Sequence, residues 1–360
     1  MKNLRGLAVI LFLAVAAPAV ADDLFEIKPV VDGVYAAIAK PQFKVNSNAA
    51  IILLDDGVLV VDTHSKPSAA RALLQQIAKL TDKPVRYVVD THFHWDHYQG
   101  NQAYLDTWPK EVEIISSEAT RESIEHRGIP RIKHEILAVP KEIEELKARL
   151  PKATDANEKS QLQGNLKQAE DYLEELKAMR VALPSITFDR SLILHRKSRT
   201  VQILWLGKAH TDGDVFVYLP KEKFIATGDA LQGWIPYMGD SYPYDWIKTL
   251  ELVERLDFDY AVGGHGDVLR GKDQFEHWRH YLSDLMDETA AVYALGASRA
   301  EAEKSVTEKL RAKYGPDFAA DEKSAAAIRK ASGPKADEGF AESVKGNVQK
   351  AYRVVSGDTD

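Results

Sequence analysis

The stretch THFHWDH at residues 91–97 places three histidines and one aspartate within seven positions. Imidazole rings carry polar nitrogens that need partners when buried, so this crowding is unfavourable in an ordinary hydrophobic core. His92 and His94 are alternate residues, and alternate side chains of an extended segment point the same way. The stretch follows the apolar run Val85 to Val89, which is typical of a buried strand. The sequence therefore predicts that these side chains bind something at the end of a strand.

Three later segments carry the same kinds of side chain and also follow runs with strand character. They are GKAHTDGD at 207–214, ATGDALQG at 226–233 and GGHGD at 263–267. Loops at strand ends are where a rigid scaffold presents functional side chains. His277 and His280 lie in a helical pattern instead, so we interpret them as ordinary helix residues. The four segments together predict a site for two metal ions.

The predicted metal ligands divide into two sets joined by one carboxylate. The first set is three imidazoles, which leave a coordination position open for water: His92, His94 and His210. The second set combines one carboxylate with two imidazoles: Asp96, His97 and His265. Asp229 is expected to bind both ions, because a carboxylate has two oxygens. These ligand types suit zinc, with iron or manganese as alternatives, so we predict two Zn²⁺ ions per chain.

The composition excludes several classes of site and partner. The 360 residues include no cysteine, so neither disulfides nor thiolate ligands are available. The formal net charge of −7 disfavours nucleic acid as a partner. Hydrophobic residues make up 45% and charged residues 28%, which is typical of a globular protein with a substantial core. We therefore expect the partner to be a small-molecule substrate.

Residues 1–21 have the features of a secretory signal peptide. Lys2 and Arg5 give a positive start, residues 7–17 form an apolar run, and a small-residue cleavage pattern ends at Ala21. The apolar run is too short to suit a permanent membrane anchor, which is the alternative interpretation. We expect an exported protein, periplasmic or secreted, without a permanent membrane anchor.

Strand and helix patterns alternate along residues 22–297, which we predict to form the main domain. Short β-branched runs precede helical patterns in the order βββα, and the same order follows a second time. That order predicts two sheets packed face to face with helices outside, an αββα four-layer sandwich of the mixed α/β class.

Two helical additions interrupt or follow this pattern. Residues 141–180 carry leucines at helical spacing and predict an inserted helical hairpin that bends between Pro151 and Asn157. The hairpin fits three roles: a solvated addition, a lid, or an arm through which the chain forms an oligomer. Residues 298–360 predict a helical C-terminal extension with breaks at Gly315-Pro316 and Gly333-Pro334.

The four histidine and aspartate segments resemble those of the metallo-β-lactamase superfamily, over roughly residues 24–282. The resemblance implies an αββα sandwich with a binuclear metal site at one edge, and activity as a metal-dependent hydrolase. Asp62 in LVVDTH matches a further family position, which implies that it supports a metal ligand from behind. A turn residue at a strand end is the alternative interpretation of Asp62.

Differences from individual branches narrow the activity that the resemblance implies. His94 stands where redox di-iron members carry a glutamate, which disfavours reduction of oxygen or nitric oxide. The lack of cysteine excludes the β-lactamases that use a thiolate at the second zinc. Asp229 resembles the bridging carboxylate of glyoxalase II and of lactonases, but Gln232 stands where lactonases have a tyrosine.

The expected reaction is hydrolysis of a small molecule. Two zinc ions lower the pKa of a shared water, so a hydroxide that bridges them can attack a carbonyl carbon. Asp96 would be the catalytic residue that orients this nucleophile or accepts its proton. A lactam, lactone or other ester is the expected substrate, and β-lactamase-like activity falls within that range. The alternatives are a mononuclear-iron oxidoreductase resembling sulfur dioxygenases, a thioester or phosphodiester hydrolase, and a binding protein without catalysis.

Aromatic residues near the predicted ligands are candidates for a substrate pocket, with ordinary packing beneath loops as the alternative for each. The candidates are Phe93, Trp95, Tyr98, Trp234, Tyr237, Tyr242 and Tyr244. His64 is close to the predicted site along the chain and is a further candidate for substrate contact.

Overall fold

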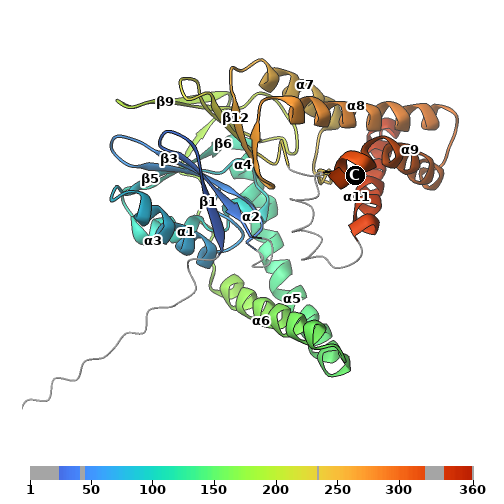
Figure 1. Ribbon diagram of the computed structural model, residues 1–360, viewed down its shortest axis with the longest axis horizontal. Helices are drawn as coiled ribbons and strands as arrows, with labels where there is room; N and C mark the ends of the chain where they lie inside the picture. The colour runs from blue at the N-terminus through green and yellow to red at the C-terminus, as the bar shows by residue number, and fades with distance from the viewer. Residues whose placement is uncertain (1–23, 41–44, 233–234, 321–335, 359–360) are drawn as a thin grey trace, which may run out of the picture.

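Two mixed β-sheets pack face to face, with helices against the outer face of each sheet (Figure 1). The computed structural model describes residues 24–40, 45–232, 235–320 and 336–358. This architecture is the αββα sandwich that the order of strand and helix patterns predicts. The predicted signal peptide at 1–21 lies outside the described residues. None of the described helices combines the length and the apolar character needed to span a bilayer.

The first sheet starts as an antiparallel meander and continues with parallel strands. In chain order its strands are β1 (Phe25–Val31), β2 (Val34–Ala39), β3 (Ala49–Leu53), β4 (Val58–Val61), β5 (Val85–Val89), β6 (Glu113–Ser117) and β7 (Ile186–Phe188). Pairing is antiparallel up to β4 and parallel from β4 onward. Parallel neighbours need a crossover connection, which is helical here. The crossover helices between β4 and β6 are α1 (Pro67–Leu80), α2 (Trp95–Tyr98) and α3 (Asn101–Thr107).

The second sheet has the strand order β13-β12-β11-β10-β9-β8. Its strands are β8 (Ser191–His195), β9 (Thr200–Leu204), β10 (Phe216–Leu219), β11 (Phe224–Gly228), β12 (Tyr260–Gly263) and β13 (Val268–Arg270). Only β11 and β12 pair in parallel among these described strands, and helix α7 (Pro243–Glu254) connects them. Helix α8 (Asp273–Ala294) packs beside α7 over the outer face.

The core between the sheets is built from alternate residues of both sheets. Ile52 and Val61 face inward from the first sheet, and Val217 and Phe224 face them from the second. Full burial of each such side chain contributes about 1.5–3 kcal/mol. On the other face of the first sheet, Leu73 of α1 packs into a separate apolar cluster. The central strands of each sheet, such as β4 and β10, are therefore buried on both sides.

A long helical hairpin separates β6 from β7 and projects from the sandwich (Figure 1). Its helices are α5 (Ile129–Arg149) and α6 (Ala156–Ala178), and α5 continues from α4 (Glu118–Ser123) through a π-helical turn at Ile124–Gly128. The predicted hairpin began at residue 141, whereas α5 begins a full twelve residues earlier. The difference arises because Pro140 lies inside α5, where a proline usually marks a helix boundary.

The C-terminal extension is helical as predicted and packs on α8 (Figure 1). It contains α9 (Arg299–Ala320) and α11 (Ala336–Ser356). The predicted break at Gly315-Pro316 is wrong, because α9 continues through both residues. The predicted break at Gly333-Pro334 lies outside the described residues.

Replacement of the exposed Pro140 by alanine tests the strain in α5. Pro140 cannot donate to the carbonyl of Ile136, and its ring crowds that carbonyl. Pro140→Ala should therefore stabilise the protein by about 1–2 kcal/mol, after allowance for the greater freedom of the unfolded chain. Guanidinium unfolding and amide exchange in α5 measure this. A lower free energy of unfolding would contradict the account of α5.

Candidate metal centre

The parallel strand pairs bring distant parts of the chain to one edge of the sandwich. β4 and β5 end side by side, so Asp62 follows one strand and the stretch 90–97 follows the other. β11 and β12 end side by side in the second sheet, and the Gly264 amide donates to the Gly228 carbonyl at 2.8 Å. The Val215 amide donates to the Thr91 carbonyl at 2.9 Å and so joins the two sheets at this edge.

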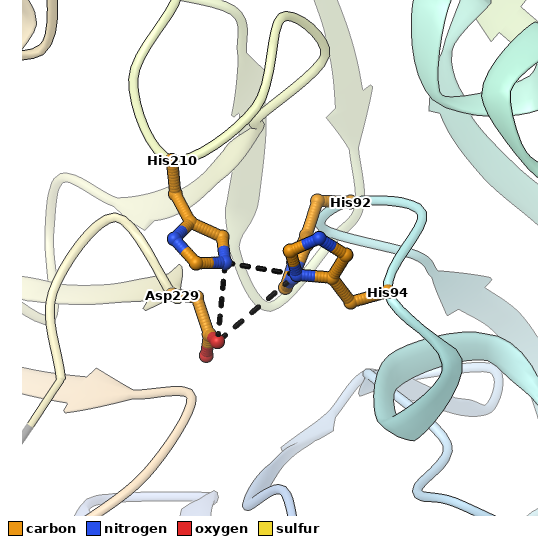
Figure 2. A group of neighbouring side chains, drawn as sticks. All are labelled: His92, His94, His210 and Asp229. Atoms are coloured by element: carbon orange, nitrogen blue, oxygen red, sulfur yellow. Dashed lines mark hydrogen bonds and ion pairs between the residues drawn. The ribbon is translucent and has the colours of Figure 1, made fainter. Parts of the chain in front are cut away.

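The first group of candidate ligands contains His92, His94, His210 and Asp229, whose ligand atoms all lie within 4.8 Å of one another (Figure 2). The Nε2 of His210 lies 2.9 Å from the Nδ1 of His94. The Oδ2 of Asp229 lies 3.5 Å from the His210 Nε2 and 3.9 Å from the His92 Nε2. Three imidazole nitrogens and one carboxylate oxygen therefore converge on a single point.

The second group contains Asp96, His97 and His265, which also converge within 4.8 Å. The Oδ2 of Asp96 lies 3.5 Å from the Nε2 of His265 and 3.7 Å from the Nε2 of His97. The other oxygen of Asp229, Oδ1, lies 3.3 Å from each of these two nitrogens. Asp229 thus presents one oxygen to each group. The structure brings all seven predicted ligands together in the predicted division.

The chemistry of these side chains fits bound cations. The Nε2 atoms of His92 and His97 are buried, and neither has a hydrogen-bond partner among the described residues. Buried polar atoms without partners cost about 1–3 kcal/mol each, which a cation would offset. Gly264 leaves room beside them, because a Cβ there would overlap Asp229 Oδ1 and approach His97 Cε1 to 2.9 Å. Two divalent cations fit this donor set, one at each group.

Asp62 holds His97 from behind, as predicted from the sequence. The Asp62 Oδ2 lies 2.8 Å from the His97 Nδ1, and Oδ1 accepts from the Thr91 amide at 2.8 Å. A proton on Nδ1 leaves the Nε2 lone pair facing the second group. Asp62 has φ = 63°, in the left-handed region that costs a non-glycine residue about 1–3 kcal/mol. The backbone is thus strained where this carboxylate is positioned.

A corresponding support for His94 was not predicted. The Asp240 Oδ2 lies 2.9 Å from the His94 Nε2, and the Arg127 guanidinium donates to Asp240 Oδ1. The same guanidinium lies 4.3 Å from the centre of the Phe93 ring. The separation of 113 residues between Arg127 and Asp240 leaves no local pattern from which to infer this contact.

The loop at residues 46–48 contacts two members of the second group, Asp96 and His265. The Asn46 carbonyl lies 3.2 Å from the Nδ1 of His265, and the Ser47 hydroxyl donates to the Asp96 carbonyl. The Asn48 side chain donates to the Gly263 carbonyl at 3.1 Å. Loop 46–48 therefore fixes the positions of two candidate ligands from opposite sheets.

The sequence model of the metallo-beta-lactamase superfamily matches residues 43–265, which contain all seven candidate ligands. The chain belongs to the metallo-beta-lactamase superfamily. Members of this superfamily are mostly metal-dependent hydrolases, and the His/Asp cluster implies a divalent metal, commonly zinc. The superfamily resemblance predicted from the four sequence segments is confirmed.

Individual relatives of this superfamily member are distant. A linear primary-alkylsulfatase from Pseudomonas sp. (strain ATCC 19151) is 24% identical over 231 residues, or 61% of this chain and 42% of the relative. A metallo-beta-lactamase type 2 from Elizabethkingia meningoseptica is 26% identical over 29% of this chain and 44% of the relative. The chain thus spans less than half the length of each of these curated relatives.

Solved structures share the superfamily fold. A metallo-beta-lactamase from Pontibacter korlensis has a TM-score of 0.52 at 16% identity, covering 72% of this chain and 99% of that chain. The metallo-beta-lactamase DIM-1 has a TM-score of 0.50 at 15% identity, covering 72% of this chain and 97% of that chain.

Burial and neighbouring charges shift the pKa values of several candidate ligands toward the protonation states that bind cations. Burial lowers the pKa of His92 and the His97 imidazole lowers it further, while burial and His94 lower the pKa of His210 to about 3. These rings are therefore neutral and able to bind a metal. Burial raises the pKa of Asp229, but the His265 and His97 imidazoles outweigh burial and hold that pKa well below its ordinary value. Asp229 is therefore ionised.

His97 behaves differently in the absence of a metal. Burial lowers its pKa, but the carboxylates of Asp229, Asp62 and Asp96 outweigh burial and raise the pKa well above the ordinary value. A proton on its Nε2 would compete with a metal ion for the same lone pair. Metal binding at the second group should therefore release this proton.

A cavity of about 310 Å³ opens onto both ligand groups. Of the aromatic candidates, Trp95 and Tyr237 line it, together with Arg131, Gln232 and five candidate ligands. Its lining ligands are His94, Asp96, His210, Asp229 and His265. Arg131 was not predicted, and its position depends on the register of α5.

The remaining pocket predictions need correction. Phe93 and Tyr98 are buried with Ile124 in a small cluster away from the cavity lining. Tyr242 lies beneath the ammonium group of Lys208 and does not line the cavity.

Of the other three candidates, neither Tyr244 nor His64 lines the cavity. Tyr244 is 47% exposed outside the cavity lining, and Trp234 lies outside the described residues. His64 is buried against the Phe25 ring, with its Nδ1 2.9 Å from the Ser47 carbonyl, so it cannot contact substrate.

Removal of the Asp240 carboxylate tests its support of His94. Asp240→Ala should weaken zinc binding at the first group about 10–100-fold, because His94 loses the partner that fixes its tautomer and orientation. Competition with a chelating dye measures this affinity. Asp245→Ala, at a residue whose side chain is 52% exposed on α7, is the control. Equal zinc affinity in the Asp240 and Asp245 variants would show that Asp240 does not position His94.

Proposed function

We propose that this chain is an exported hydrolase that uses two divalent ions, most naturally zinc, to cleave an ester-type or lactam bond in a small molecule. One observation carries the proposal: each oxygen of Asp229 faces a different group of ligand atoms. A carboxylate that offers one oxygen to each of two neighbouring ions suits a binuclear hydrolytic site. The predicted signal peptide supports export to the periplasm.

Bound at the two groups, the ions would lower the pKa of water and polarise the bond to be cleaved. Other residues of the chain fix the tautomers of the candidate ligands and accept protons. Asp62 keeps a proton on the Nδ1 of His97, and Asp240 keeps one on the Nε2 of His94. Asp96 reaches the cavity and can accept a proton from the attacking water. No serine or cysteine nucleophile is required.

Arg131 supports the proposal of a substrate with an anionic group. It is the only arginine or lysine in the described lining of the cavity that holds the ligands. Its Glu135 partner is 3.7 Å away, and its side chain is 52% exposed, so its donors can reach a ligand. Arginine binds carboxylate and sulfate-like groups through paired hydrogen bonds.

Two bond types are compatible with this site. A lactam, lactone or other carboxylic ester is the first, and β-lactamase relatives support it. A sulfate ester is the second candidate. The alkylsulfatase relative supports it, because that similarity extends over 61% of the chain, and Arg131 offers a partner for the sulfate.

The mononuclear-iron oxidoreductase alternative requires ligands for one ion only. Two complete groups of ligand atoms therefore favour the two-ion hydrolase. Oligomer formation through the hairpin stays a prediction. Most apolar residues of α5 and α6 pack against each other, whereas Leu137 of α5 is 80% exposed.

The bridging role of Asp229 is tested by the metal content of Asp229→Ala. Loss of a carboxylate shared by both groups should reduce zinc from two ions per chain to one or none, and activity should fall in parallel. Elemental analysis of dialysed protein measures the metal, and Asp245→Ala, at a residue whose side chain is 52% exposed, is the control. Two zinc ions in the Asp229 variant would remove the bridging assignment, and one iron in the wild type would favour the oxidoreductase.

Arg131→Gln tests whether Arg131 binds an anionic group of the substrate. It should raise KM about 10-fold or more for anionic substrates, such as nitrocefin or an aryl sulfate, and leave neutral aryl esters unaffected. Lys133→Gln, at an exposed residue of the same helix, is the control. An equal loss with neutral and anionic substrates would contradict the role of Arg131.

A further inference from the structure

A second cavity lies between the helical hairpin and the sandwich. It has a volume of about 310 Å³ and is lined from the sandwich side by Asn46, Ser65, Lys66 and Trp95. The hairpin supplies the other wall: Glu135, Val139 and Glu142 from α5, and Gln168, Ala169 and Tyr172 from α6. Nothing in the hydrolytic site described above requires this second cavity.

The second cavity adjoins the metal cavity. Trp95 lines both cavities, so the two cavities meet at this side chain. On α5, Arg131 lines the metal cavity and Glu135 lines the second cavity, one helical turn further along. Their charged groups are 3.7 Å apart. A ligand could therefore extend from one cavity into the other past Trp95.

The two cavities differ in chemistry. The metal cavity is lined mainly by polar and charged side chains, whereas the exposed surface of the second is more apolar than polar. The Tyr172 ring lies 6.3 Å from the Trp95 ring, and Val139 and Ala169 add aliphatic surface. Two carboxylates and one ammonium group at its wall disfavour an anionic occupant.

We propose that the second cavity is a substrate subsite, which takes the apolar acyl or alkyl chain of a molecule whose reacting group lies at the metal ligands. This inference rests on the proposed function, since it assigns the distal half of the same substrate. The hairpin is then the element that selects substrates by chain length. Burial of each methylene group in such a subsite tightens binding by up to about fourfold.

The test uses straight-chain hydroxamates as probes, because a hydroxamate group chelates zinc and its alkyl chain can be varied. Titration calorimetry on the zinc-loaded mature protein gives Kd for acetohydroxamate, butanohydroxamate and octanohydroxamate. Octanohydroxamate should bind at least about 30-fold more tightly than acetohydroxamate. Val139→Trp should abolish this gain by filling the subsite, while acetohydroxamate affinity and zinc content stay unchanged.

A second variant and a control guard against loss of folding in the hairpin. Tyr172→Ala removes one wall of the subsite and should reduce the gain about 3–10-fold, whereas Tyr172→Phe should retain it. Leu137→Trp places the same large side chain on α5 at a residue that is 80% exposed. This variant should bind the whole series like the wild type.

The outcomes separate the two proposals. Failure of acetohydroxamate to bind would contradict the metal centre, and the subsite would fall with it. Binding of acetohydroxamate without tighter binding of longer chains would overturn the subsite alone. A chain-length gain that persists in both Val139→Trp and Tyr172→Ala would also overturn it.

Discussion

Two pairs of parallel strands end at the same edge of the sandwich, and the position of every candidate ligand depends on this constraint. β4 and β5 place Asp62 beside the stretch 90–97, while β11 and β12 place Asp229 beside His265. Packing between the sheets then sets the distance across the edge. A rigid core is needed because like-charged carboxylates and crowded imidazoles would otherwise move apart.

Candidate ligands from both sheets meet at the Asp229 carboxylate. Asp229 directly follows β11 of the second sheet, yet His92 and His97 approach it from the first sheet. Gathering imidazoles without a metal has a cost at His92, whose pKa is lowered by burial and by neighbouring imidazoles, whereas the carboxylates around His97 raise the pKa of that residue. Strain at Asp62, which has a positive φ, lies at the same edge. Bound cations would offset the cost of the buried imidazoles. They would also use the ligand geometry that the strained backbone at Asp62 maintains.

The candidate ligands could be predicted from the sequence, because they lie in loops after recognisable strands and are histidines and aspartates, the side chains that bind metals in a chain without cysteine. The residues outside those segments that position a ligand or line the cavity could not be predicted from the sequence. Asp240 and Arg127 meet across 113 residues, and Arg131 reaches the cavity only because α5 begins before Pro140. Tyr98 is an incorrect prediction of the other kind. It was predicted to line the pocket because it is close in sequence to several candidate ligands, but its ring packs into a buried cluster. Local patterns predict strand ends, whereas side-chain contacts depend on tertiary packing.

The central claim is that the chain binds two cations, with Asp229 between them. Anomalous diffraction at the zinc absorption edge, from crystals of the zinc-loaded protein, measures this most directly. The account predicts two peaks: one among His92, His94 and His210, the other among Asp96, His97 and His265. A single peak, or two peaks that Asp229 does not bridge, would contradict it.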